Sequence, residues 1–176
     1  LGHEGGPVVV DEPVPALADL LDLLVPASAG LLLEIKVGQG GRRYTGIEAK
    51  ALALVRARGL ASRTVAMAFE PDTLSRVREL EPTVATALLV GEEELRGARA
   101  TPAEAAGWAR QAGAGTLGLE HRVLDDRVVA AARKAGVTVA AWTVNEEAAM
   151  RRLIALGIDT IITDRPDLAL ALLGRR

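Results

Sequence analysis

Hydrophobic and polar positions along this chain follow two alternating periods. Short apolar runs recur six times, and amphipathic stretches with helical spacing of apolar residues lie between them. The runs are apolar on both faces, as is typical of strands buried in a parallel sheet. The order therefore predicts a series of βα units, with strands at Leu31–Val37, Thr64–Ala68, Val84–Val90, Thr116–Leu119, Val137–Trp142 and Thr160–Thr163.

The predicted helices carry their own start and stop signals. Thr45 and Glu48 are spaced as a capping box that opens a helix, and Gly59 ends it. Thr101 and Glu104 repeat that spacing around Pro102, with Gly113 after the helix. The remaining helices are expected at Pro15–Leu24, across Leu74–Leu80 before Pro82, at Asp125–Ala135 before Gly136, from an Asn145 cap to Gly157, and after Pro166.

The βα units form one continuous array without a linker or a shift in composition, which predicts a single domain over residues 1–176. A complete (β/α)₈ barrel takes about 250 residues, so six of eight units would need about three-quarters of that length. A doubly wound open sheet could also hold six strands. The sequence has no P-loop motif, and no G-x-G-x-x-G motif follows a predicted strand and opens a helix, where it would place a nucleotide at a switch point of such a sheet. Periodicity alone leaves both folds open.

Composition narrows the classes of partner. A net charge of −2 spread over 176 residues gives no basic footprint for nucleic acid or an anionic membrane. The absence of cysteine excludes disulfides and thiolate metal sites. The most apolar stretch, Leu17–Leu33, is interrupted by Asp19, Asp22 and Pro26, so it falls short of the roughly 20 apolar residues of a membrane span. With aromatic residues at 2%, the core must consist of Ala, Val, Leu and Ile.

A few residues stand out as candidates for chemistry. Glu34 and Lys36 are two positions apart on a strand, so both side chains point to the same face of the sheet. Burying these charges is costly unless they pair or bind an ion, and a structural ion pair and a functional site are equally consistent with that. Trp142 ends a predicted strand, at the rim where barrel enzymes place their active sites. Phe69 follows another strand, where core packing is as good an interpretation as a site.

Four segments occur together in an informative order: LLLEIKV, MAFEPDTL, AAWTVN and IITDRPD, beginning at Leu31, Met67, Ala140 and Ile161. Together they resemble the glycerophosphodiester phosphodiesterases, metal-dependent hydrolases built on a (β/α)₈ barrel. The resemblance extends from about Val14 to Leu173. It implies a TIM (β/α)₈-type barrel of the α/β class, represented here by about six of eight βα units.

The resemblance also implies an activity, the metal-dependent hydrolysis of a small-molecule glycerophosphodiester to glycerol 3-phosphate and an alcohol. Carried over residue by residue, Glu34 is a ligand of a divalent metal, Mg²⁺ or Ca²⁺, and Lys36 is a catalytic contact to the phosphate. Trp142 and Phe69 are then substrate-binding residues. Where relatives read Ser-Phe this chain reads Ala68-Phe69, which removes a hydroxyl from that strand end. The T-D-R-P-D segment is assigned a structural role, in which Asp164 accepts backbone N–H groups at the opening of the last helix.

The chain departs from the family pattern at its start. Relatives open with a His-Arg-Gly strand, a Glu-x-Asp strand and a His-Asp pair, and Leu1–Pro13 is too short to hold two βα units. His3 and His121 lack the surroundings of the family's catalytic histidines. We therefore expect this chain to lack part of the active site and to belong to a longer protein. We also expect the isolated chain to aggregate, fold partly or form a homo-oligomer, because both end strands would be unpaired sheet edges.

A non-catalytic role is the alternative interpretation. A degenerate barrel without the two histidine motifs could bind a phosphorylated polyol or complete itself with a partner chain. Detection of glycerol 3-phosphate release separates this interpretation from the enzymatic one.

Overall fold

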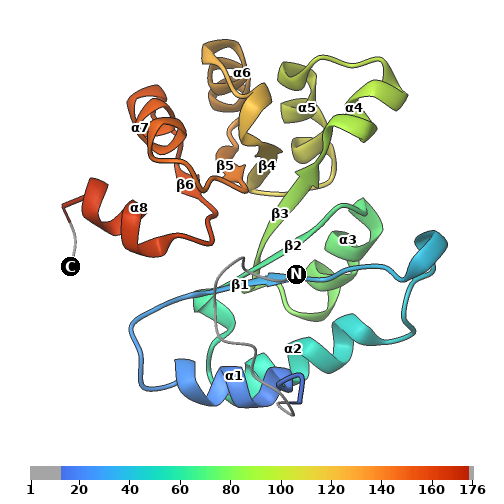
Figure 1. The fold of residues 1–176 in the computed structure, drawn as a ribbon. Coiled ribbons are helices and arrows are strands. Elements are labelled where there is room, and N and C mark those ends of the chain that lie inside the picture. Colours follow the sequence, from blue (N-terminus) through green and yellow to red (C-terminus); the bar gives the residue numbers. More distant parts are fainter. Residues whose placement is uncertain (1–12, 175–176) are drawn as a thin grey trace.

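Six parallel strands pair in chain order in the computed structural model, which describes residues 13–174 (Figure 1). The sheet order is β1-β2-β3-β4-β5-β6, so β1 and β6 are its two edges. The strands are β1 (Leu31–Glu34), β2 (Thr64–Ala68), β3 (Ala85–Val90), β4 (Thr116–Glu120), β5 (Thr138–Trp142) and β6 (Thr160–Ile161). This arrangement confirms the predicted partial barrel of six βα units.

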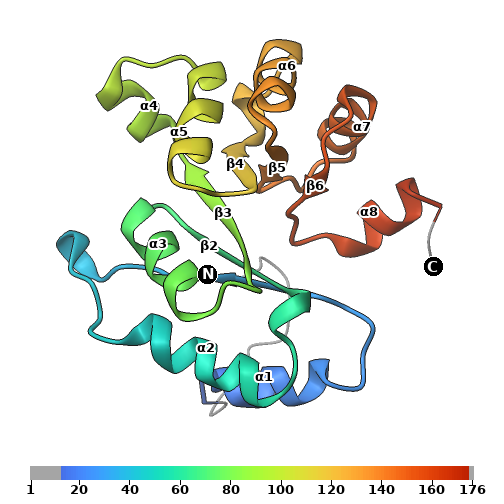
Figure 2. The ribbon, with the colours of Figure 1, turned by 180° about the vertical axis from the view of Figure 1, so that it is seen from behind.

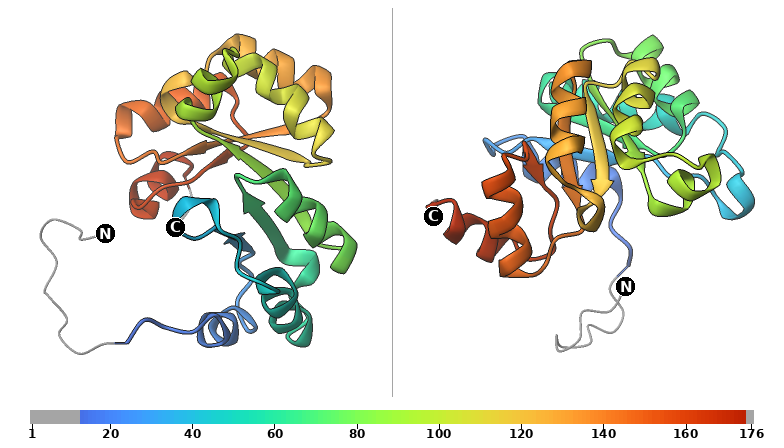
Figure 3. Two further views of the ribbon diagram at one scale, coloured as in Figure 1. Left: turned by 90° about the vertical axis from the view of Figure 1, so that its right-hand side faces the viewer. Right: turned by 90° about the horizontal axis from the view of Figure 1, so that it is seen from above.

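Helices cover the outer face of the curved sheet, and the inner face lines an open interior (Figures 2 and 3). The helices are α1 (Leu17–Leu24), α2 (Ile47–Ala57), α3 (Pro71–Leu80), α4 (Glu92–Ala98), α5 (Ala105–Gln111), α6 (Asp126–Ala135), α7 (Glu147–Leu156) and α8 (Pro166–Leu172). Short 3₁₀ turns are η1 (Gln39–Gly41), η2 (Ala61–Arg63), η3 (Pro102–Glu104) and η4 (His121–Val123). None of the helices in this part of the chain is long and apolar enough to cross a membrane.

Along each strand, successive side chains point alternately into the core beneath the helices and into the barrel interior. On β3, Leu88 and Val90 point outward into the main core beneath the helices, whereas Ala87 and Leu89 line the interior. The main core covers β3 to β6, and two smaller clusters lie around β1 and β2. The largest fully buried side chains are those of Leu, Val and Met, so aliphatic packing replaces the missing aromatics, as the composition predicted.

Several helix boundaries follow the predicted signals. Asp125 caps α6, because its carboxylate accepts the backbone N–H groups of Arg127 and Val128 at 3.0 Å each. Thr101 donates its backbone N–H to Glu104 at 2.7 Å, at the start of η3 and α5. The glycines predicted at helix ends adopt positive φ angles there, namely Gly59, Gly113, Gly136 and Gly157.

The predicted capping box at Thr45 is wrong. The helix α2 begins at Ile47 after Gly46, which has a φ of 73°, and no side chain caps it. Glu48 is 5% exposed and accepts a hydrogen bond from Arg43 instead. The carboxylate therefore turns toward the preceding loop, where a charged partner offers a stronger bond than a backbone N–H.

Edge strand β1 pairs with β2 along its whole length, and Arg63 holds the segment that leads into it. The guanidinium of Arg63 donates to the carbonyls of Leu24, Ala27 and Ala29, in the segment that joins α1 to β1. A Cβ at Gly30 would lie 2.9 Å from the carbonyl oxygen of Arg63, so only glycine permits this close approach. These contacts position β1. Because Leu32 on this edge is 39% exposed, the expected pairing of sheet edges in a homo-oligomer stays a prediction.

Replacing Arg63 with alanine should lower the free energy of unfolding by about 1.5–3 kcal/mol, since three carbonyls lose a charged donor. Urea denaturation followed by circular dichroism measures this. Arg96→Ala is the matched control, because Arg96 makes an exposed ion pair with Glu92 and its loss should cost less than about 0.5 kcal/mol. Equal effects of the two substitutions would contradict the role given to Arg63.

The pair of Arg43 and Glu48 should make stability depend on pH in the acid range. Burial alone would raise the pKa of Glu48, but hydrogen bonds from Arg43 and the backbone and the charge of Arg43 outweigh it. The pKa of Glu48 therefore lies below its ordinary 4.5. The unfolded chain then binds the proton more readily than the folded one, so the stabilisation is complete above about pH 4.5 and is lost as the pH falls through the lowered folded pKa.

Glu48→Gln should accordingly be less stable than the parent chain at pH 7, and the gap should narrow as the pH falls below 4.5. Thermal unfolding midpoints at a series of pH values measure the gap. A gap that stays constant across this range would show that the carboxylate charge does not stabilise the fold.

Candidate active site

The carboxyl ends of the strands converge on a cavity of about 230 Å³, and all four residues singled out from the sequence line it. Glu34 comes from the end of β1, Lys36 follows it, Phe69 follows β2, and Trp142 ends β5. A neighbouring cavity of about 300 Å³ shares Glu34, Lys36 and Phe69. We refer to the two together as the mouth site. Parallel strands end at the same rim, so residues as far apart in the sequence as Glu34 and Ile162 meet here.

Glu34 and Lys36 form an accessible ion pair. The Nζ atom of Lys36 lies 3.5 Å from Oε2 of Glu34, and their side chains are 72% and 25% exposed respectively. Such an exposed pair contributes little to stability, because solvent screens it and the lysine stem is free to move. Both groups are therefore available to a ligand at the mouth site. The interpretation of Glu34 and Lys36 as a purely structural ion pair explains only part of how they are arranged.

The two aromatic residues pack against each other on the opposite wall. The rings of Phe69 and Trp142 meet edge to face, with centroids 5.8 Å apart and planes at 82°. Gly118 on β4 makes room for Leu89, since a Cβ there would lie 2.6 Å from a methyl of Leu89, and it would lie at an ordinary contact distance of 3.6 Å from the Trp142 ring. The indole N–H of Trp142 is buried and has no hydrogen-bond partner among residues 13–174.

Asn145 and Asp164 tie the loops after β5 and β6 together, which corrects the capping roles predicted for both. The amide of Asn145 donates to the Asp164 carboxylate at 2.9 Å. Its carbonyl accepts the Asp164 backbone N–H at 2.9 Å and the Thr163 hydroxyl at 3.1 Å. Helices α7 and α8 begin after Glu146 and Arg165, and neither of those side chains caps its helix. A direct bond between neighbouring strand ends replaces two separate caps and holds the short edge strand β6.

Two carboxylates at the rim were missed by the sequence analysis. Glu94 on α4 lines the mouth site and accepts the backbone N–H of Gly91 at 2.8 Å. Glu120, at the end of β4, accepts the backbone N–H of Glu92 at 3.1 Å. Glu120 carried a usable signal, because it follows an apolar run as Glu34 does. Nothing in the sequence pattern marks Glu94.

Within residues 13–174, no histidine lines the mouth site. His121 starts η4 and is absent from the residues that line the mouth site, and its backbone carbonyl accepts a hydrogen bond from Arg152 at 2.7 Å. His3 lies outside the described residues. Across residues 13–174, no group of three or more His, Asp or Glu side chains is placed to hold a metal ion. Glu34 is thus one carboxylate oxygen donor and not a complete set of ligands.

Comparison with known proteins identifies the family of the chain. The sequence profile of the glycerophosphoryl diester phosphodiesterase family matches residues 3–168. YhdW of Bacillus subtilis (strain 168), a protein of the glycerophosphodiester phosphodiesterase type, is 27% identical over 92% of this chain and 63% of its own length.

Solved structures show the same fold. A protein of this type from Agrobacterium tumefaciens strain C58 superposes with a TM-score of 0.81 at 24% identity, over 89% of this chain and 62% of its own. An Oleispira antarctica phosphodiesterase, solved with the product sn-glycerol-3-phosphate, superposes with a TM-score of 0.71 at 19% identity, over 91% and 61%.

This chain therefore spans about 60% of the length of the relatives that it matches. The family profile covers most of the described fold, including every residue of the mouth site. The chain belongs to the glycerophosphoryl diester phosphodiesterase family.

Proposed function

We propose that the protein containing this chain hydrolyses a glycerophosphodiester to glycerol 3-phosphate and an alcohol. The observation that carries the proposal is the meeting of Glu34, Lys36, Phe69 and Trp142 in one cavity at the carboxyl ends of the strands. Family membership supports it, as does the product found in the related Oleispira antarctica phosphodiesterase. In the reaction water adds to phosphorus, the P–O bond to the alcohol breaks, and the departing alcohol takes up a proton.

Lys36 is assigned to the phosphate. Its ammonium is largely exposed and already lies beside a carboxylate at the rim, so it can reach a phosphoryl oxygen without unfolding the strand end. A positive charge there offsets the negative charge that the phosphoryl oxygens carry as water attacks. The edge-to-face pair of Phe69 and Trp142 then forms the apolar wall against which the carbon skeleton of the substrate lies.

Glu34 is assigned to a divalent metal, Mg²⁺ or Ca²⁺. Both ions take six or more oxygen ligands, so a single carboxylate holds neither firmly. The described residues thus do not fit the metal by themselves, and substrate oxygens, water and groups outside residues 13–174 would have to supply the other ligands. A metal held there would polarise the phosphoryl group. Glu34 would be the ligand that β1 contributes to this metal.

Release of glycerol 3-phosphate from glycerophosphocholine and glycerophosphoethanolamine tests the activity. Turnover in the presence of Mg²⁺ or Ca²⁺ that is abolished by a chelator is the expected result for the protein containing this chain. Binding of glycerol 3-phosphate without any turnover would instead support the non-catalytic alternative, a barrel that binds a phosphorylated polyol.

Glu34→Gln should reduce turnover by at least about 100-fold, because an amide is a weaker ligand than a carboxylate and loses its charge. Lys36→Ala should lower turnover by a similar factor. Glu79→Gln and Lys50→Ala are matched controls, since each removes the same charge from an exposed helix position away from the mouth site. Unchanged turnover in Glu34→Gln would remove the metal assignment, and unchanged turnover in Lys36→Ala would remove the phosphate assignment.

A further inference from the structure

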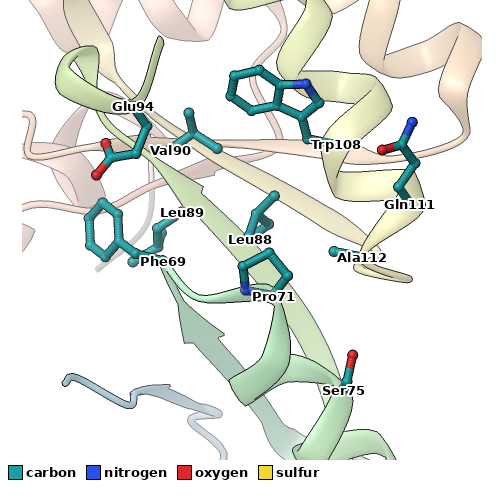
Figure 4. A pocket seen from close by; sticks show the side chains of 10 residues that line it. All are labelled: Phe69, Pro71, Ser75, Leu88, Leu89, Val90, Glu94, Trp108, Gln111 and Ala112. Carbon is teal, nitrogen blue, oxygen red and sulfur yellow. The ribbon is translucent and has the colours of Figure 1, made fainter. Parts of the chain in front are cut away.

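The ring of Phe69 lies between two cavities. One is the mouth site, and the other, of about 420 Å³, lies between α3 and α5 in the layer of helices (Figure 4). We call this second cavity the helix groove. Figure 4 shows Phe69 and Glu94 together at one end of it, and Trp108 on the wall formed by α5. Because the helix groove is hollow, packing on that side does not fix the ring of Phe69.

The indole of Trp142 is not fixed by a polar bond of its own. It packs edge to face on Phe69, with ring centroids 5.8 Å apart, and its buried N–H has no hydrogen-bond partner among residues 13–174. The position of the indole therefore depends on the backbone at the end of β5 and on what holds that backbone in place.

The backbone after β5 is held by the segment after β6. Val144 donates its backbone N–H to the carbonyl of Ile162 at 2.9 Å, and Ile162 donates its own to the carbonyl of Ala141 at 2.8 Å. These two bonds lie on either side of Trp142 along the chain. Trp142 and Ile162 both line the mouth site. One wall of the mouth site thus consists of two segments that are joined to each other.

Strand β6 offers that wall only a short support. It is two residues long, and it pairs with β5 alone among the described strands. Directly beyond the backbone bonds, Asn145 makes three further hydrogen bonds, at 2.9–3.1 Å, to Thr163 and Asp164. One of these joins an amide to a charged carboxylate, which is the stronger kind of hydrogen bond. We call Asn145, Thr163 and Asp164 the latch.

We propose that Asn145 and Asp164 are positioning residues for substrate binding. The latch holds the loop after β5 on the loop after β6, and it thereby keeps the indole of Trp142 at the wall of the mouth site. Breaking the latch then weakens substrate binding in a protein that is still folded. The inference rests on the proposed function for its kinetic part, because only that function makes the mouth site the place where substrate binds.

A reciprocal exchange of the two side chains tests the latch. Asn145→Asp removes the amide donor and places a second carboxylate against that of Asp164, so two like charges face each other. Adding Asp164→Asn restores the pair in reverse, because the amide at position 164 then donates to the carboxylate at position 145. That carboxylate can still accept the Thr163 hydroxyl and the backbone N–H of residue 164.

Two further variants complete the set. Asn145→Ala removes the latch without adding a charge, so it should change both readouts in the same direction as Asn145→Asp, and by less. Asp167→Asn is the matched control, because it breaks the neighbouring exposed ion pair of Arg165 and Asp167 and leaves the latch intact. Circular dichroism confirms that each variant is folded at the temperature of the measurements.

The first readout is the indole N–H signal of Trp142 in protein labelled with ¹⁵N-tryptophan, assigned by its loss in Trp142→Phe. Asn145→Asp should shift this signal and speed the exchange of the buried N–H with solvent by at least about tenfold. The exchanged pair should restore it. The indole of Trp108, in the helix groove, is the internal control and should keep its signal in every variant of the latch.

The second readout is the hydrolysis of glycerophosphocholine by the protein that contains this chain. Asn145→Asp should raise KM by at least about fivefold and change kcat by less than about twofold, because the wall contacts the carbon skeleton and not the phosphate. Glu34 and Lys36, which are assigned to the metal and the phosphate, belong to the segment of β1. The exchanged pair should return KM to the parent value, and Asp167→Asn should leave it unchanged.

A loss of stability alone would leave both the KM and the indole signal of the folded protein unchanged, and that result would overturn the inference. So would an effect of Asn145→Asp that Asp164→Asn fails to reverse, or a shifted indole signal with an unchanged KM. Failure of the proposed function has a different signature: the parent protein releases no glycerol 3-phosphate, and the indole signal then decides whether the latch positions Trp142.

Discussion

The parallel pairing of six strands in chain order is the constraint on which the rest of the structure depends. Each strand must run in the same direction as its neighbour, so a helix has to return the chain to the starting edge every time. The carboxyl ends therefore all lie at one rim. Because the sheet also curves, Glu34 and Trp142 share a cavity at this rim, although β1 and β5 are not neighbours in the sheet (Figure 3).

The shortage of aromatic residues makes their positions informative. The chain has four, and its buried core is filled by Leu, Val, Ala and Met. Phe69 and Trp142 meet at the mouth site, and Trp108 lines the helix groove. A core that packs without rings leaves these large flat side chains at the walls of cavities. The edge-to-face pair of Phe69 and Trp142 at the rim is an example.

The mouth site and the helix groove meet at Phe69 and Glu94. The segments that follow β2 and β3 thereby link three places, namely the interior of the barrel, its rim and the gap between α3 and α5. Both segments end strands that are paired on each side, so the walls of the shared entrance rest on the most constrained part of the sheet. The edge strands β1 and β6 are paired on one side, and polar contacts of Arg63 and of Asn145 with Asp164 hold the segments beside them.

The sequence by itself determined the local elements and the family. Apolar runs located all six strands to within a few residues, and glycines at positive φ marked the helix ends, because these signals act through neighbouring residues only. The motif residues Glu34, Lys36, Phe69 and Trp142 were found in the same way.

Tertiary structure decided what depends on contacts between distant segments. Asn145 bonds to Asp164, which follows another strand, because this charged partner offers a stronger hydrogen bond than the local helix N-terminus. The helix groove depends on how far apart α3 and α5 lie, and no local pattern encodes a distance between two helices that make few mutual contacts.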